Sequence, residues 1–174
     1  TSRRINPLYI TYRMNAGYLP PEHWIHKQGG RIIGEACHII DLAGFLTESE
    51  VVSIFNEDIR PATDFYLPDD NKCITLKYSD GSIAVIHYIA MGSASFPKEY
   101  MEVHFDGKTI VLDDYKKLYG YGMNIPSLVS QKGSKGHIEE LQQLHKSLTG
   151  QTNDWPINLK EMLTTTRLAY MASE

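Results

Sequence analysis

The chain of 174 residues has only two cysteines, Cys37 and Cys73, and no Cys-x-x-Cys pair. This excludes a disulfide framework and a cysteine zinc site, and it favours a reducing, cytoplasmic location. The net charge of −4, with both signs interspersed, leaves no basic patch for a nucleic-acid backbone. No apolar run approaches the roughly 20 residues of a membrane span, and no secretory signal pattern opens the chain. We therefore expect no nucleic-acid or membrane partner.

Motifs for dinucleotide and nucleophile chemistry are also lacking. The sequence contains no Gly-x-Gly-x-x-Gly, no phosphate-cradling loop and no Gly-x-Ser-x-Gly. It begins at Thr1 without methionine and soon enters an alternating segment, so we expect a piece excised from a longer chain. Its length suits a single domain over residues 1–174.

Alternating β-branched and aromatic residues predict a sheet. Two Asp-Gly pairs, at 80–81 and 106–107, are typical of tight hairpin turns. Strands are expected at 7–14, 51–55, 73–78, 82–88, 100–105 and 108–112, with a weaker edge strand within 115–123. Consecutive hairpins indicate antiparallel pairing.

Helical spacing of apolar residues predicts helices over 31–47, 137–148 and 158–172. A long loop without regular structure is expected at 15–30, and a surface loop at 130–136. The resulting class is α+β: an open, mainly antiparallel or mixed sheet with helices on one face.

The central hairpin, 73–88, is apolar on both faces, although the helices suffice for one. Pairing with another subunit, as a homodimer or homotetramer through the open face, is one explanation. A further crossover segment of this domain is the other.

The helix that follows Gly29-Gly30 separates polar from apolar residues. At about 100° per residue, the polar side carries Arg31, Glu35, His38 and Asp41. The opposite side carries Ile32, Ala36, Ile39, Ile40 and Ala43. A titratable face in the middle of a helix predicts a functional site.

His38 is the leading candidate for acid-base catalysis, because imidazole titrates near neutral pH and Glu35 could orient it. The alternative is a core histidine bonded to Asp41 or to a backbone carbonyl. The glycine pair and Arg31 at the start of the helix favour an anionic ligand.

Other titratable residues give weaker signals. His23 and His26 could join His38 in a zinc site, but they lie in a loop without helical ligand spacing, so no metal is expected. The pair Asp69-Asp70 is expected to be solvated.

Several ordered segments resemble one known family. Residues 12–24 read YRMNAGYLPPEHW and residues 29–41 read GGRIIGEACHIID. With shorter segments at 80–83, 95–99, 135–137 and 165–167, they are similar to the C-terminal domain of the Gfo/Idh/MocA family (glucose-fructose oxidoreductase and inositol dehydrogenase). The resemblance is to the branch associated with bacterial polysaccharide and sugar-nucleotide pathways.

This resemblance implies an NAD(P)-dependent oxidoreductase that acts on a hydroxyl or ketone of a sugar or sugar nucleotide. A separate N-terminal Rossmann domain would hold NAD or NADP and a catalytic lysine. The present domain would supply an oligomerisation sheet and one wall of the substrate pocket, with no cofactor of its own. Alone, it is expected to be inactive.

The resemblance also implies site residues. His38 matches the family's histidine, the expected proton acceptor or donor, and Asp41 matches an aspartate three residues later. Gly34 stands where many members have an acid, so Glu35 either replaces that acid or faces elsewhere.

We expect further substrate contacts at four positions. Arg13 would bind an anionic group and Asn15 a hydroxyl. Trp24 would stack on the substrate, and Arg31 would supply a second cation. The alternative functions are a non-catalytic sugar-binding or oligomerisation domain of the same fold and, from another class, a metal hydrolase.

Overall fold

Alternating side chains build one sheet of eight strands in the computed structural model, which describes residues 4–130 and 135–174. The strands are β1 Tyr9–Asn15, β2 Val51–Asp58, β3 Asn71–Tyr78, β4 Ile83–Ile89, β5 Glu99–Phe105, β6 Lys108–Asp113, β7 Lys117–Tyr121 and β8 Leu128–Val129. Their order is β2-β3-β4-β1-β5-β6-β7-β8. β1 pairs parallel with β4, and the other pairs are antiparallel, so the sheet is mixed.

Both Asp-Gly hairpins are confirmed. Gly81 and Gly107 have φ angles of 89° and 69°, which are accessible to glycine at little cost. The expected edge strand in 115–123 is present as β7, but β8 pairs outside it, so β7 is not the edge. The surface loop expected at 130–136 falls largely on residues 131–134, which lie outside the described part of the chain.

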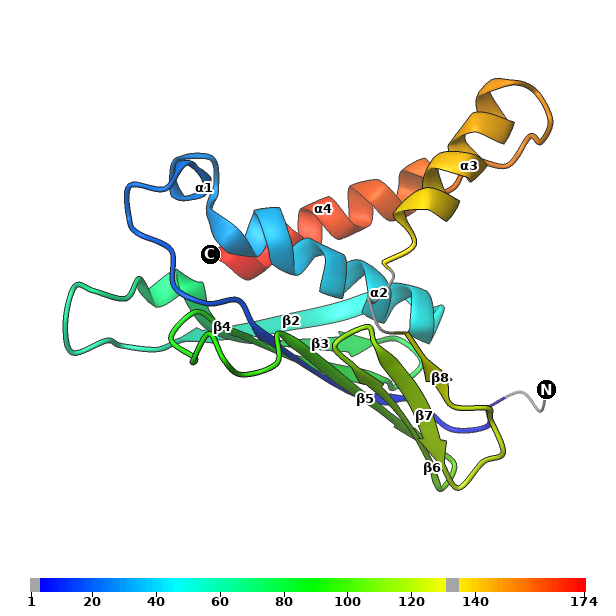
Figure 1. Cartoon of the computed structure of the whole chain (residues 1–174), viewed down its shortest axis with the longest axis horizontal. Coiled ribbons are helices and arrows are strands. Elements are labelled where there is room, and N and C mark those ends of the chain that lie inside the picture. Colours follow the sequence, from blue (N-terminus) through cyan, green and yellow to red (C-terminus); the bar gives the residue numbers. More distant parts are fainter. Residues whose placement is uncertain (1–3, 131–134) are drawn as a thin grey trace.

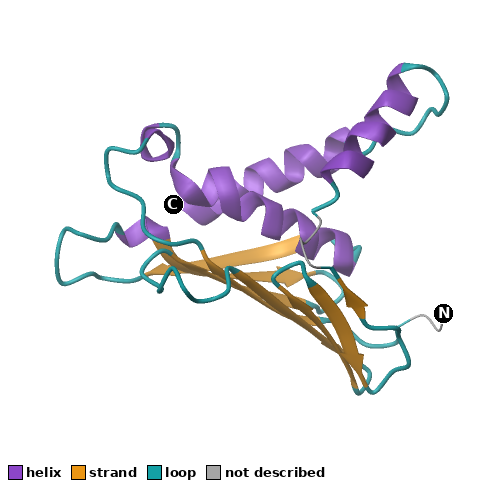
Figure 2. Cartoon of the chain, in the orientation of Figure 1, coloured by secondary structure: helices purple, strands orange, loops and turns teal. Residues whose placement is uncertain are grey.

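The helical elements are α1 Trp24–Lys27, a π-helical turn η1 Ile32–Ala36, α2 Cys37–Thr47, a 3-10 turn η2 Pro68–Asp70, α3 His137–Leu148 and α4 Leu159–Ser173. α1 interrupts the loop that was expected to lack regular structure. α2 and α4 pack side by side over one face of the sheet (Figures 1 and 2). α3 projects away from the sheet, and its Ile138 and Leu141 are 68% and 65% exposed.

The core lies between the sheet and α2 with α4. Alternate residues of the central strands face the helices and are fully buried, as Ile74, Leu76 and Ile86 show. Farther along the same face, Ile110, Leu112 and Leu118 are only half-buried. Helix packing therefore covers β2, β3, β4, β1 and β5 and leaves the helix side of β6 to β8 less covered.

The other face of the sheet is open. In Figure 2 no described segment crosses it, which rules out a crossover within the described residues as its cover. Tyr9, Phe55 and Tyr121 on this face are 48%, 63% and 61% exposed.

In the described ranges, no helix combines the length and apolar character needed to cross a bilayer.

Candidate active site

His38 lies in the first turn of α2 and is exposed. Among the described residues, none makes a side-chain hydrogen bond or ion pair with its imidazole. Its neighbours Ile39 and Ile40 are buried and fix the rotation of the helix. The exposure overturns the alternative of a core histidine, and Asp41 instead accepts a 2.9 Å hydrogen bond from Thr165 Oγ1 of α4. The imidazole of His38 is thus accessible at the surface.

Glu35 lies in the π-helical turn and points to the sheet. Its Oε2 accepts a 2.8 Å hydrogen bond from the Tyr88 hydroxyl, and its Oε1 accepts one of 3.2 Å from Arg31 Nε. No hydrogen bond joins Glu35 to His38. A π turn bonds residue i to i+5 and holds more residues than an α turn, so a wheel drawn at 100° misplaces Glu35 relative to His38.

Arg31 is only 3% exposed, although the helical wheel put it on the polar face. Its guanidinium donates to the carbonyls of Gly17 at 2.6 Å and Ala16 at 3.1 Å, and it lies 5.5 Å from the centroid of the Tyr88 ring. These contacts attach the loop after β1 to the start of the helix. Most of the donors of Arg31 are therefore used within the chain.

Asp70 is buried beside Arg31, and the expectation that it is solvated is wrong. It is 3% exposed, and its Oδ2 lies 3.8 Å from both Arg31 Nη1 and His26 Nε2. Burial raises the pKa of the Asp70 carboxyl, and the charges of Arg31 and His26 only partly oppose this. Among the described residues, Asp70 Oδ1 and His26 Nε2 have no hydrogen-bond partner.

Arg13 and Asn15 hold the loop after β4. Arg13 has its side chain on the open face of the sheet, because its neighbours Tyr12 and Met14 face the helices. It donates to the Pro97 carbonyl at 2.7 Å. Asn15 is buried and donates to the Ser93 carbonyl at 2.8 Å.

Trp24, at the start of α1, is 60% exposed and offers a free stacking surface. Its ring centroid lies 5.6 Å from that of His23. The structure therefore bonds Glu35 to Arg31, whereas among the described residues the side chains of His38, Arg13 and Asn15 form no hydrogen bond with that pair.

One polar cluster escaped sequence reasoning. Glu99, in β5, is 4% exposed, and its carboxylate accepts hydrogen bonds from the Tyr12 hydroxyl at 2.7 Å and from Lys135 Nζ at 2.6 Å. Tyr115 lies beside both donors. Alternation could have placed Tyr12 and Glu99 on the helix face, but nothing in the sequence pairs them with Lys135.

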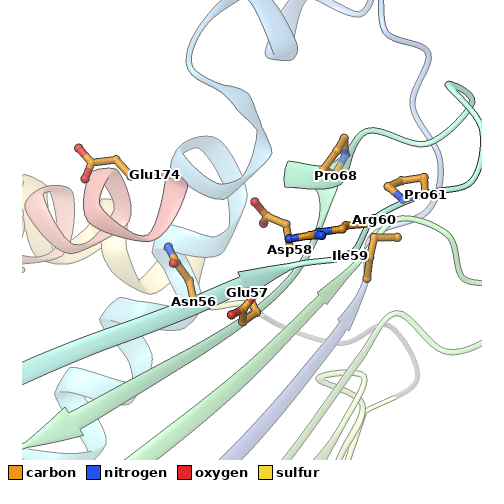
Figure 3. A pocket seen from close by; sticks show the side chains of 8 residues that line it. All are labelled: Asn56, Glu57, Asp58, Ile59, Arg60, Pro61, Pro68 and Glu174. Carbon is orange, nitrogen blue, oxygen red and sulfur yellow. The ribbon is translucent and has the colours of Figure 1, made fainter.

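The chain has an open pocket elsewhere, at the carboxyl end of β2. Its volume is about 490 Å³, and its lining is shown in Figure 3: Asn56, Glu57, Asp58, Ile59, Arg60, Pro61, Pro68 and Glu174. None of the expected site residues lines it. His38 lies on the surface, so enclosing a substrate there needs a second wall.

The histidines of the loop do not assemble a metal site. In the described part of the chain, no three or more His, Cys, Asp or Glu side chains converge to hold an ion. His23 Nδ1 instead accepts from the Ile25 amide at 3.4 Å, capping α1.

Searches with the sequence found no matching family model and no matching curated protein. Solved structures match by fold. A UDP-N-acetylglucosamine 3-dehydrogenase from Acidithiobacillus ferrooxidans has a TM-score of 0.73 at 14% identity over 96% of this chain. An oxidoreductase from Agrobacterium radiobacter in complex with NAD+, L-tartaric acid and magnesium has a TM-score of 0.70 at 16% identity over 97%.

A third similar structure is the WlbA dehydrogenase from Bordetella pertussis in complex with NADH and UDP-GlcNAcA, with a TM-score of 0.66 at 14% identity over 96% of this chain. The chain spans about half the length of these proteins: 52%, 55% and 51% respectively. The chain therefore has the fold of the C-terminal domain of Gfo/Idh/MocA-type oxidoreductases.

Proposed function

We propose that this chain is the substrate-binding and oligomerisation domain of an NAD(P)-dependent oxidoreductase that acts on a hydroxyl or ketone of a sugar or sugar nucleotide. The observation that carries the proposal is His38, an exposed imidazole with no side-chain partner in the described part of the chain, in the first turn of α2 in a domain with this fold. Two of the similar proteins are described with sugar nucleotides, and two are described with NAD+ or NADH.

In this proposal His38 is the general base or acid of the reaction. When a hydroxyl is oxidised, the imidazole takes the hydroxyl proton, and in the reverse direction it returns the proton to the ketone oxygen. The nicotinamide cofactor supplies hydride transfer when bound.

The residues present do not make a complete dinucleotide site. The helix after β1 starts with a π turn, and its first-turn cation, Arg31, is committed to the Ala16 and Gly17 carbonyls. No glycine-rich phosphate loop precedes it. We therefore place NAD or NADP mainly in a separate dinucleotide-binding domain, which would also supply the second wall over His38.

The second candidate function is a non-catalytic sugar-binding or oligomerisation domain. The position of Glu35 favours it, because its carboxylate is engaged by Arg31 and Tyr88 rather than by the imidazole of His38. Under this alternative the domain binds the sugar and catalyses no reaction on it.

Replacing His38 distinguishes the two functions. In a full-length protein that contains this domain, we expect His38→Ala to lower kcat by about 10²- to 10⁴-fold, the usual contribution of a general acid or base. NAD+ reduction would be followed by absorbance with a panel of UDP-sugars that includes UDP-N-acetylglucosamine.

His145→Ala is the matched control, because His145 is an exposed histidine of α3. It should retain the wild-type kcat. An active wild type whose kcat is unchanged by His38→Ala would refute the catalytic role.

A further inference from the structure

A buried carboxylate holds an exposed ammonium on the helix side of the sheet. The Glu99 side chain is 6% exposed and the Lys135 side chain 49%, with Nζ 2.6 Å from Glu99 Oε1. The other oxygen, Oε2, accepts from the Tyr12 hydroxyl at 2.7 Å. Lysine has three N–H donors, so two remain for a ligand after the bond to Glu99.

Tyr115 completes the cluster and is held in an unfavourable backbone conformation. Its ring lies 5.0 Å from Lys135 Nζ, and its hydroxyl lies 3.5 Å from that of Tyr12. Asp114 and Tyr115, the centre of the turn between β6 and β7, have φ angles of 51° and 53°. Turns with two positive φ angles prefer Asn-Gly, so a tyrosine at the second position is strained.

The cluster borders the less covered half of the sheet. Tyr12 and Glu99 belong to β1 and β5, where the packing of α2 and α4 ends. On α2, Asp41 accepts a hydrogen bond from Thr165 of α4, and His38 lies one turn before Asp41 on the same side of the helix. The cluster and α2, which carries His38, therefore lie on the same side of the sheet.

The charge of the cluster indicates its ligand. One carboxylate and one ammonium neutralise each other, so the cluster has no excess positive charge for a phosphate. Its free groups are ammonium N–H donors and a phenol hydroxyl that both donates and accepts. Such a mixture matches alcohol groups, which also donate and accept.

We propose that Lys135 and Tyr115, positioned by Glu99 and Tyr12, form a subsite that binds ring hydroxyls of the sugar substrate. This inference rests on the proposed function and deepens it by naming the part of the substrate that is bound. Lys135 and Tyr115 contact the sugar. Glu99 and Tyr12 are positioning residues, and burial together with the bonds to Tyr115 and Glu99 raises the pKa of Tyr12, which keeps it a donor.

The test uses steady-state kinetics of the full-length protein with NAD+ and the UDP-sugar that it turns over fastest. Losing hydrogen bonds from a charged donor should raise KM for the sugar by about 10- to 100-fold in Lys135→Met, with a smaller change in kcat. Lys135→Arg should recover part of that loss. Lys160→Met is the control, since Lys160 pairs with Glu50 at 2.8 Å, is 80% exposed and should leave KM unchanged.

Lys135→Met leaves the buried Glu99 carboxylate without its cation and could impair folding, so a second variant separates binding from stability. Asparagine tolerates positive φ better than tyrosine, so Tyr115→Asn should keep or raise Tm while raising KM. A folded Tyr115→Asn with wild-type KM would overturn the subsite and leave the proposed function intact. A wild type that reduces no NAD+ with any UDP-sugar would overturn the proposed function and this subsite with it.

Discussion

At the scale of single residues, Arg31 shows how burial changes the role of a charged group. As a cation near the start of a helix it resembles a ligand-binding residue. In the structure its donors satisfy the Gly17 and Ala16 carbonyls and the Glu35 carboxylate. Arg31 therefore connects three segments, and its first contribution is to stability.

Arg31→Met tests this assignment. Removing the cation leaves Glu35 and the buried Asp70 without their positive neighbour, and breaking a buried ion pair typically costs about 3–5 kcal/mol. We expect a loss in the lower part of that range, because Glu35 is partly exposed. Urea unfolding of this chain followed by circular dichroism would measure it.

Arg167→Met is the comparison, because Arg167 is exposed on α4. It should change the free energy of unfolding by less than about 0.5 kcal/mol. Equal effects of the two substitutions would contradict the buried role of Arg31.

At the scale of elements, the helix after β1 follows the sequence pattern only in part. Ile39, Ile40 and Ala43 are buried as the apolar face predicts. The π turn was not foreseen. At Gly34 an added Cβ would lie 3.2 Å from Ile25 Cδ1, so this part of the helix packs closely against α1.

Gly44 offers a test of α2 as an element. It lies inside the helix, and a Cβ added there would meet no atom within 4 Å. Gly44→Ala should therefore stabilise this chain by about 0.5–1 kcal/mol, because alanine loses less backbone entropy in a helix. Thermal unfolding would show it as a higher Tm.

Gly34→Ala is the matched substitution in the same helical segment. There the gain in helix propensity is opposed by the Ile25 contact, so it should stabilise less than Gly44→Ala or destabilise. A larger gain at Gly34 than at Gly44 would show that the close packing against α1 does not constrain the helix.

The sequence predicted the bounds of the strands better than it predicted which strands and side chains lie next to each other. Local alternation and Asp-Gly turns located β3 to β6 to within a few residues. Three features depend on residues that are distant in sequence. They are the pairing of β8 outside β7, the parallel pairing of β1 with β4, and the contact between Glu99 and Lys135. No local pattern encodes such pairings.

At the scale of the whole molecule, the open face of the sheet is a surface that no described segment crosses. Val85 lies in its centre, between Thr11 of β1 and Thr75 of β3. An exposed sheet face with apolar residues is typical of an interface. It supports the proposed homodimer or homotetramer.

Val85→Arg should reduce that assembly, because association would bury an unpaired charge. We expect sedimentation velocity at micromolar concentration to show the mass fall from oligomer to monomer. Leu141→Arg, on the exposed side of α3, is the control and should leave the mass unchanged. A wild type that sediments as a monomer, or a Val85→Arg variant with wild-type mass, would refute an interface on this face.

The sequence by itself determined the α+β class and most strands and helices, because these depend on periodicity within short segments, and it named His38 as a candidate. Only the tertiary structure decided which titratable groups are free. It exposed His38, buried Arg31 and Asp70, turned Glu35 toward Tyr88, and joined Lys135 to Glu99. Burial and pairing depend on which distant segments meet, and that is set by packing the whole chain rather than by any local stretch of it.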